Sequence, residues 1–189
     1  MFRHGTAVAC GERVIRMTKK MEDGRMAKKI KGERMTEKEI SVVLREMARG
    51  QRKPLCDAWY GEWKDDSSVD ELLDKFVRGM DFCVENDYPP LPFIRKFFDK
   101  DDLHRHRIYL DEEVALDGNN GSYVFLGECS GEIVCDGYMT VNIVVRHRSK
   151  IKVVAMGGSR VYVDVYEEGD CAANIESGST CKVYGSKGK

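Results

Sequence analysis

Apolar residues return at every tenth position through the C-terminal half of the chain. One series begins at Tyr123 and continues with Ile133, Ile143, Val153, Val163, Ala173 and Val183. Two further series begin two residues to either side, at Gly121 and Phe125. Because alternate side chains of a strand point to the same face, three positions at spacing two form one inward face. The stretches ECSG, RHRS, MGGS, EEGD and ESGS lie between these triplets, so the pattern predicts seven strands joined by turns over 121–185.

Two architectures have this period. In a β-solenoid, two strand-and-turn units make one coil, so each strand pairs in parallel with the strand two units later. In an antiparallel meander or sandwich, each strand pairs with its immediate neighbour through a hairpin. Two features favour a short solenoid. The inward residues are mostly small or β-branched, and the two-residue turns typical of hairpins are absent except at Asp136-Gly137.

The positions that alternate with the inward series point outward, and the early ones are apolar. This outward column contains Val124, Val134, Val144 and Val154. Apolar side chains on an outer surface indicate that another surface covers them, and we expect either the helical part of the chain or a second copy to do so. The ends of a short solenoid also expose strand edges. Both features predict a homo-oligomer, a trimer or a dimer, formed through the β-repeat.

A second outward surface lies in the strand around residue 164. Tyr162, Asp164 and Tyr166 alternate there on one face, a combination that favours binding of a protein or a glycan. Cleavage of a glycan would need two carboxylates held at a fixed separation along a groove. A repeat this short offers little groove, so we expect binding without catalysis.

The residues before the repeat have helical periodicity. Thr36 with Glu39 forms a capping box before an amphipathic helix over about 37–49, and Ser68 with Glu71 forms another before a helix that continues to about residue 86. A short aromatic helix follows Pro92. The sequence therefore predicts an α+β protein in four parts. These are a basic extension at 1–35 that we expect to be disordered, a helical domain at 36–100, a linker with the first strand at 101–120, and the β-repeat domain at 121–185.

Charge is unevenly placed along the chain. Residues 1–34 carry ten Lys or Arg against four Asp or Glu, although the whole chain has a net charge of −1. Such an arm can touch phosphate or an acidic surface. The repeat mixes both signs and lacks stacking aromatics, so we expect no nucleic-acid partner. Five of the nine methionines lie within the first 35 residues, and Met35 directly precedes the first capping box, which favours a natural translation start at Met35.

Several function classes lack their sequence signals. No long apolar window indicates a membrane span or a secretory signal, so we expect no membrane partner and a location in the cytoplasm or in a virion assembled there. The seven cysteines form no C-x-x-C pair, which favours reduced thiols packed as small apolar groups. No phosphate-loop, dinucleotide or nucleophile-elbow motif occurs. We therefore expect no cofactor and a non-enzymatic structural or binding role.

One polar cluster supports a different hypothesis. His104 and His106 lie among acidic residues, and His-x-His beside carboxylates can bind a metal ion. The alternative function is a small cytoplasmic enzyme or metal-binding regulator that uses this segment. A charged, solvated linker has the same composition, so we expect no metal there.

The segment GSYVFLGECSGEIVCDG, followed by NIVVRHRSKIKVVAMGGSRVYVDV, resembles uncharacterised short proteins of gut Bacteroidetes and their phages. Those proteins join a helical head to a β-repeat tail, and the resemblance covers about residues 36–184. It implies a component of phage or mobile-element origin, such as a fibre, an adhesin or a scaffold. It implies no catalytic residues.

Overall fold

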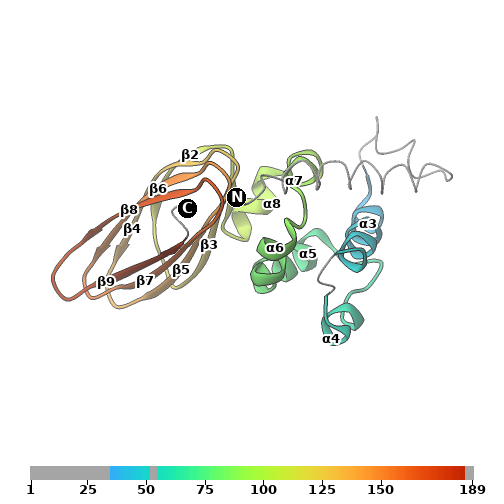
Figure 1. Ribbon diagram of the computed structural model, residues 1–189, viewed down its shortest axis with the longest axis horizontal. Coiled ribbons are helices and arrows are strands. Elements are labelled where there is room, and N and C mark those ends of the chain that lie inside the picture. The colour runs from blue at the N-terminus through green and yellow to red at the C-terminus, as the bar shows by residue number, and fades with distance from the viewer. Residues whose placement is uncertain (1–34, 52–54, 186–189) are drawn as a thin grey trace, which may run out of the picture.

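The computed structural model describes residues 35–51 and 55–185, so the predicted extension at 1–35 lies outside the described residues apart from Met35. The helices are α3 (Glu37–Arg49), α4 (Asp57–Gly61), α5 (Val69–Arg78), α6 (Met80–Asn86), α7 (Leu91–Phe97) and α8 (Lys100–Arg105). The strands are β1 (Ile108–Leu110), β2 (Glu113–Asp117), β3 (Gly121–Leu126), β4 (Ser130–Asp136), β5 (Thr140–Val145), β6 (Lys150–Met156), β7 (Arg160–Val165), β8 (Asp170–Ile175) and β9 (Thr180–Gly185). Figure 1 shows the helices as a head at one side of a stack of flattened β coils.

The helical head begins as the sequence predicts. The hydroxyls of Thr36 and Ser68 accept from the backbone N–H three residues on, and both capping boxes are complete. The long helix predicted after Ser68 is wrong in one respect, because it breaks at Gly79 into α5 and α6. A Cβ at Gly79 would lie 3.3 Å from the ring of Trp59. The ring of Trp59 therefore occupies the space that a side chain at position 79 would need.

The strands form two parallel sheets, and this confirms the β-solenoid over the antiparallel meander. One sheet has the order β1-β3-β5-β7-β9 and the other has the order β2-β4-β6-β8. Tyr123 pairs with Ile143, and Ile143 pairs with Val163, so one coil takes twenty residues. The fold is α+β, with a helical head followed by a solenoid.

The predicted inward series form the solenoid core. Fourteen buried residues make up this cluster, among them Phe125, Ile133, Ile143, Val153 and Val163. Residues 101–120, predicted as a linker with one strand, instead contain most of α8 and both β1 and β2. The ten-residue period does not reveal this first coil because its strands pair at other spacings, with Ile108 beside Val124 and Glu113 beside Ser130.

The outward valines do not form the single column that the sequence predicts. Successive ten-residue units alternate between the two sheets, so Val124 and Val144 lie on one outer face and Val134 and Val154 lie on the other. The head covers the first pair. Val124 is 1% exposed within the core of the head, and Val144 packs against that core. Val134 and Val154 stay half-buried on the opposite face.

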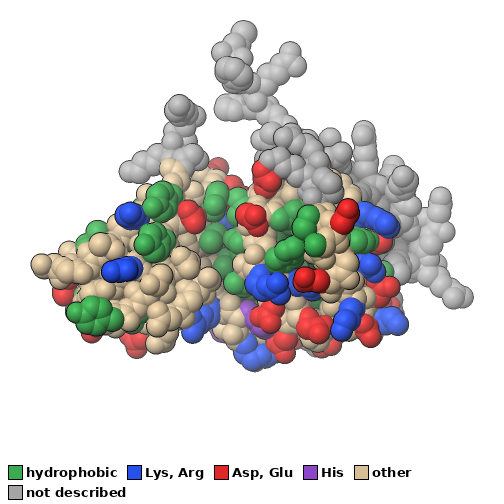
Figure 2. Space-filling model, turned by 90° about the horizontal axis from the view of Figure 1, so that it is seen from below, with side chains coloured by type: hydrophobic (Ala, Val, Ile, Leu, Met, Phe, Trp, Pro, Cys, Tyr) green, Lys and Arg blue, Asp and Glu red, His purple; other side chains and the backbone are tan. Residues whose placement is uncertain are grey.

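The same head core includes outward residues of the first coil. Ile108 and Leu110 of β1 and Leu126 of β3 are buried against the helices. The head therefore packs against the outer face of the sheet that contains β1, β3 and β5. In the view of Figure 2, Asp, Glu, Lys and Arg side chains crowd the head, whereas the solenoid has fewer charges and scattered apolar side chains. Among the described helices, none is long and apolar enough to cross a membrane.

Candidate functional site

The open end of the solenoid is the last coil, formed by β8 and β9. Their inward side chains have no further coil to cover them in the part of the chain that the structure describes. Ile175 is 50% exposed and Val183 is 45% exposed, although both belong to columns that are fully buried one coil earlier. Tyr184, which points outward beside them, is 49% exposed. Part of the apolar interior of the last coil therefore faces solvent at this end.

The inward positions of the open end carry no charge. Besides Ile175 and Val183 they hold Cys171, Ala173 and Cys181. Burial raises the pKa of Cys171 to about 12, so its thiol is neutral at physiological pH and adds to the apolar surface. All described cysteines are free thiols, which agrees with the prediction from their spacing.

Two of the predicted binding residues, Tyr162 and Asp164, lie in β7 on the outer face of the sheet that carries the head, and Tyr166 directly follows the end of this strand. Asp164 stands between Val144 and Tyr184 in the same column. All three predicted residues are half-buried. Burial and the carboxylate of Asp164 raise the pKa of Tyr166. Whether these residues bind a ligand stays a prediction, and Tyr184 links them to the open end.

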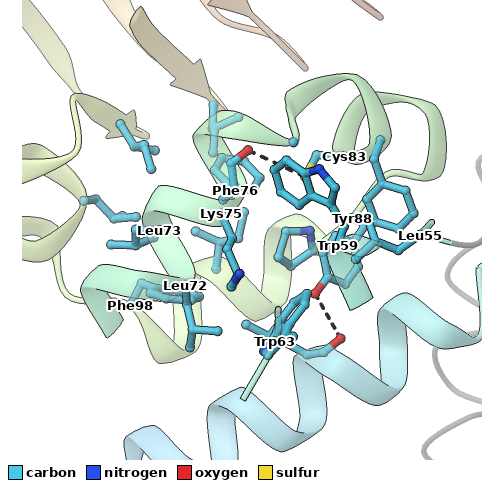
Figure 3. Close-up of a pocket in the computed structure, with 18 residues that line it drawn as sticks. Leu55, Trp59, Trp63, Leu72, Leu73, Lys75, Phe76, Cys83, Tyr88 and Phe98 are labelled. Atoms are coloured by element: carbon cyan, nitrogen blue, oxygen red, sulfur yellow. Dashed lines mark hydrogen bonds between the residues drawn. The ribbon is translucent and has the colours of Figure 1, made fainter. Parts of the chain in front are cut away.

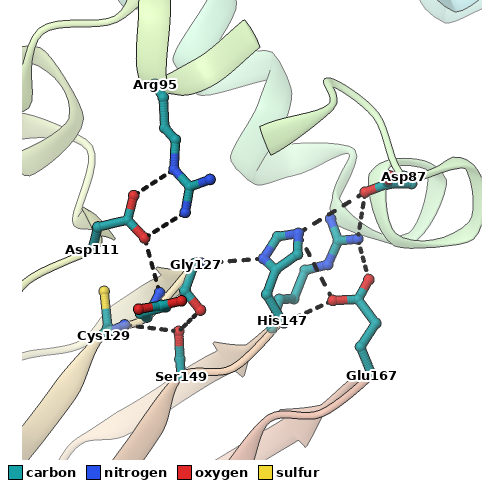
Figure 4. Close-up of polar contacts among 10 residues, drawn as sticks. Asp87, Arg95, Asp111, Gly127, Cys129, His147, Ser149 and Glu167 are labelled. Carbon is teal, nitrogen blue, oxygen red and sulfur yellow. Dashed lines mark hydrogen bonds and ion pairs between the residues drawn. The ribbon is translucent and has the colours of Figure 1, made fainter. Parts of the chain in front are cut away.

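A polar cluster joins the head to the corners of the solenoid, and the sequence pattern did not reveal it (Figure 4). Arg146, in the connection after β5, is 1% exposed. Its Nη2 lies 2.6 Å from Glu167 Oε1 and 3.3 Å from Oδ1 of Asp87, which ends α6. The imidazole of His147 and the guanidinium of Arg146 lower the pKa of Asp87. The cluster is a buried cation held by carboxylates from the head and from the next coil.

The backbone around this cluster is unusual. Asp87, Asp111, His147 and Glu167 all have positive φ, and they are four of the five non-glycine residues with positive φ in the described ranges. Side chains other than Asn, Asp and His adopt this region rarely. Such residues concentrate where the surrounding contacts fix them, and here the fixed contacts are those between head and solenoid.

Asp87, His147 and Glu167 could in principle hold a metal ion, because one ligand atom of each lies within 4.8 Å of the others. The hydrogen bonds that these residues already make argue against metal binding. Nδ1 of His147 accepts from the N–H of Gly127, so the ring proton sits on Nε2, the atom that would face the metal. Metal-binding histidines instead donate from their other nitrogen. The carboxylate of Glu167 is also occupied by Arg146 and by the His147 backbone N–H.

A second ion pair secures the same junction. Arg95 of α7 holds Asp111 with two hydrogen bonds of 2.6 and 2.8 Å. The guanidinium lowers the pKa of Asp111. Asp111 also accepts from the backbone N–H of Glu128, so one carboxylate ties α7 to two coils.

The histidines of the alternative hypothesis bind different partners. His104 lies 2.8 Å from Glu112, whereas His106 lies between Asp70 and Asp74 of α5 at 2.9 and 3.0 Å. Each ring nitrogen of His106 therefore faces a separate carboxylate. The structure does not bring the two imidazoles together on one set of ligands.

An apolar pocket lies inside the head, between Trp59, Trp63, Phe76 and Tyr88 (Figure 3). Its volume of about 30 Å³ leaves room for only one or two water molecules. Tyr88 donates to the backbone oxygen of Leu44 at its edge. The pocket is an imperfection of core packing and is too small for an organic ligand.

Comparison of the chain with protein-family models, with curated proteins and with solved structures finds no match in any of the three. The open end and the surfaces beside it are therefore the features of the molecule from which a function can be inferred.

Proposed function

We propose that the protein is a non-enzymatic structural or binding protein that self-associates through its β-repeat domain, and that the open end is the surface of association. The observation that carries this proposal is the half exposure of Ile175 and Val183, which continue fully buried columns. Covering a side chain of this size contributes about 1 kcal/mol when half of its surface is still exposed. A partner strand that continues the coil would gain this free energy of burial at several inward positions together.

The strand edges support the same proposal. β8 and β9 end their sheets, so each presents unpaired backbone N–H and C=O groups. Proteins that stay monomeric protect such edges with charged side chains, with proline, with inward-pointing charges or with a covering segment. Neither strand contains proline or an inward charge, and each carries one outward charge, Asp170 on β8 and Lys182 on β9. The edges can therefore pair with strands of another chain where these two charges meet opposite ones.

The resemblance to proteins of gut Bacteroidetes and their phages adds a context. It supports a component of phage or mobile-element origin, such as a fibre, an adhesin or a scaffold. In that setting the outward face with Tyr162, Asp164 and Tyr166 is the proposed contact for a protein or glycan ligand. In this proposal the open end mediates self-association, and the outward face binds the protein or glycan ligand.

Light scattering coupled to size-exclusion chromatography tests self-association on the full chain. We expect a mass of at least twice that of one chain for the wild type, and the mass of one chain for Val183→Lys, because a charge then replaces an apolar contact. Asn142→Lys is the matched control, since Asn142 is exposed on β5 away from the open end. A wild type that stays monomeric at high concentration contradicts the proposal.

A further inference from the structure

We infer that the partner at the open end is a second copy of this chain in a closed two-fold dimer, with β8 of each copy pairing antiparallel to β9 of the other. This inference rests on the proposed self-association and specifies its geometry. It follows from three observations: the β1 edge at the opposite end of the solenoid is covered, a head-to-tail stack places like charges side by side, and only one two-fold arrangement brings opposite charges together across the interface.

The β1 edge of the first coil is covered by the head. The inward ring of Tyr109 stacks on Phe125, and the ring of His104 from α8 lies 5.2 Å from the ring of Tyr109. The backbone N–H of Leu110 donates to the carboxylate of Glu112. An incoming strand therefore finds the edge of β1 occupied by side chains, and the helix that leads into β1 stands in its path.

Charge also opposes a head-to-tail stack. In the sheet of even-numbered strands, Glu113, Ser130, Lys150 and Asp170 form one outward column. If β2 of another copy continued this sheet after β8, its Glu113 would stand directly beside Asp170. Like charges at opposed positions destabilise strand pairing. The first coil is therefore a poor partner for the open end, whereas two identical open ends that meet form a closed, self-complementary interface.

Two arrangements of the ends are possible, because β8 and β9 run in opposite directions on the two sides of the last coil. A two-fold axis across the strands places β9 on β9 and β8 on β8. A two-fold axis along the strands places β9 of the second copy over β8. Both arrangements pair the strands antiparallel, so backbone hydrogen bonding alone does not favour either of them.

The outward charges favour the arrangement in which β8 pairs with β9. Asp170 and Glu176 are the charged groups at the two ends of β8, and Lys182 is the charged group of β9. Pairing β8 with β8 would bring four carboxylates together. Pairing β8 with β9 places Lys182 of each copy against the middle of β8 of the other, between Asp170 and Glu176, and this arrangement occurs twice. Opposite charges across a strand pair stabilise it, so the axis lies along the strands.

The first test is the size distribution of the full chain over a wide range of concentration. We expect a single dimer without larger species, because the interface closes on itself. A ladder of trimers and longer species would overturn the closed dimer while leaving self-association intact. A monomer at every concentration would remove both, so the two failures are distinguishable.

The second test reverses charges. Lys182→Glu should raise the dissociation constant of the dimer about tenfold, since an unfavourable pair then occurs twice. Adding Asp170→Lys and Glu176→Lys to the same chain should restore wild-type affinity. Lys64→Glu, an exposed change of equal charge on the head, should have no effect. A Lys182→Glu chain that dimerises as tightly as wild type, and that prefers wild type as its partner, would show β9 paired with β9 and overturn the inference.

Discussion

Nη2 of Arg146 lies 2.6 Å from Oε1 of Glu167, and this contact joins two successive corners of the solenoid on the side that faces the helical head. The guanidinium is almost fully buried, whereas the side chain of Glu167 is partly exposed. Asp87 of the head is its second carboxylate, and Nε of Arg146 has no partner. A buried cation depends strongly on such partners, because an unpaired charge in the interior is costly.

Glu167→Gln should therefore lower the free energy of unfolding by about 2 kcal/mol, the size of a hydrogen bond to a charged group. The amide keeps the shape of the side chain and removes its charge. Urea unfolding followed by circular dichroism measures the change. Glu168→Gln is the matched control on the adjacent exposed residue. Equal stability of the two variants would show that Asp87 alone satisfies Arg146.

Asp87 should make stability depend on pH in the acid range. His147 and Arg146 lower the pKa of Asp87 in the folded protein. A carboxyl whose pKa is lower in the folded state stabilises the fold above its unfolded pKa of about 4, and loses this contribution as the pH falls through the folded pKa. The contribution at neutral pH is at most about 1 kcal/mol because the carboxylate is partly solvated.

Asp87→Asn should thus be less stable than wild type at neutral pH, and the difference should shrink below about pH 4. Asparagine adopts positive φ as readily as aspartate, so the backbone of this position is preserved. Asp81→Asn on the exposed side of α6 is the control. Thermal unfolding across a pH series measures both. A difference that stays constant with pH would mean that the charge of Asp87 is not what stabilises the junction.

The junction should not bind zinc. Coordination through Nε2 of His147 would require a proton on Nδ1, and that proton would oppose the N–H of Gly127. We expect no rise in melting temperature when excess Zn²⁺ is added. A rise that is lost in His147→Ala and kept in His104→Ala would assign a metal site to this cluster, and the reverse result would assign it to the histidine segment.

The repeat was predictable because each strand contributes three inward positions and each connection has the same length. Capping boxes at Thr36 and Ser68 predicted two helix starts for a similar reason, since both signals are local. The first coil was not predicted because its connections differ in length from those of the later coils. The break at Gly79 was signalled by the glycine itself, a poor helix former, but the helical spacing of the apolar residues continues across it and predicted one helix.

The junction could have been found from the repeat itself. Gly127, His147 and Glu167 occupy the same position of successive coils, and all three have positive φ. Glycine at one of these positions indicates that the backbone there is left-handed. Of the histidine and the glutamate at the equivalent positions, the glutamate therefore stands in a conformation that it adopts rarely. Their partner Asp87 was not predictable, because the placement of the head on the solenoid is a matter of long-range packing.

Two glycines of the solenoid offer a matched test of how closely its coils pack. Gly131 and Gly137 both have φ above +100°, which strains any other residue. They differ in their surroundings. A Cβ at Gly131 would overlap the backbone oxygen of Val114 in the preceding coil, whereas a Cβ at Gly137 would meet open space.

Gly137→Ala should consequently cost about 1–2 kcal/mol, the strain of the backbone alone. Gly131→Ala should cost about 3 kcal/mol or more, because strain adds to overlap with a strand that cannot move without breaking its pairing. Urea unfolding at neutral pH gives both values. If the two substitutions cost the same, the backbone around Val114 shifts to accommodate the added methyl group at little cost, and the first two coils are packed less tightly than the structure indicates.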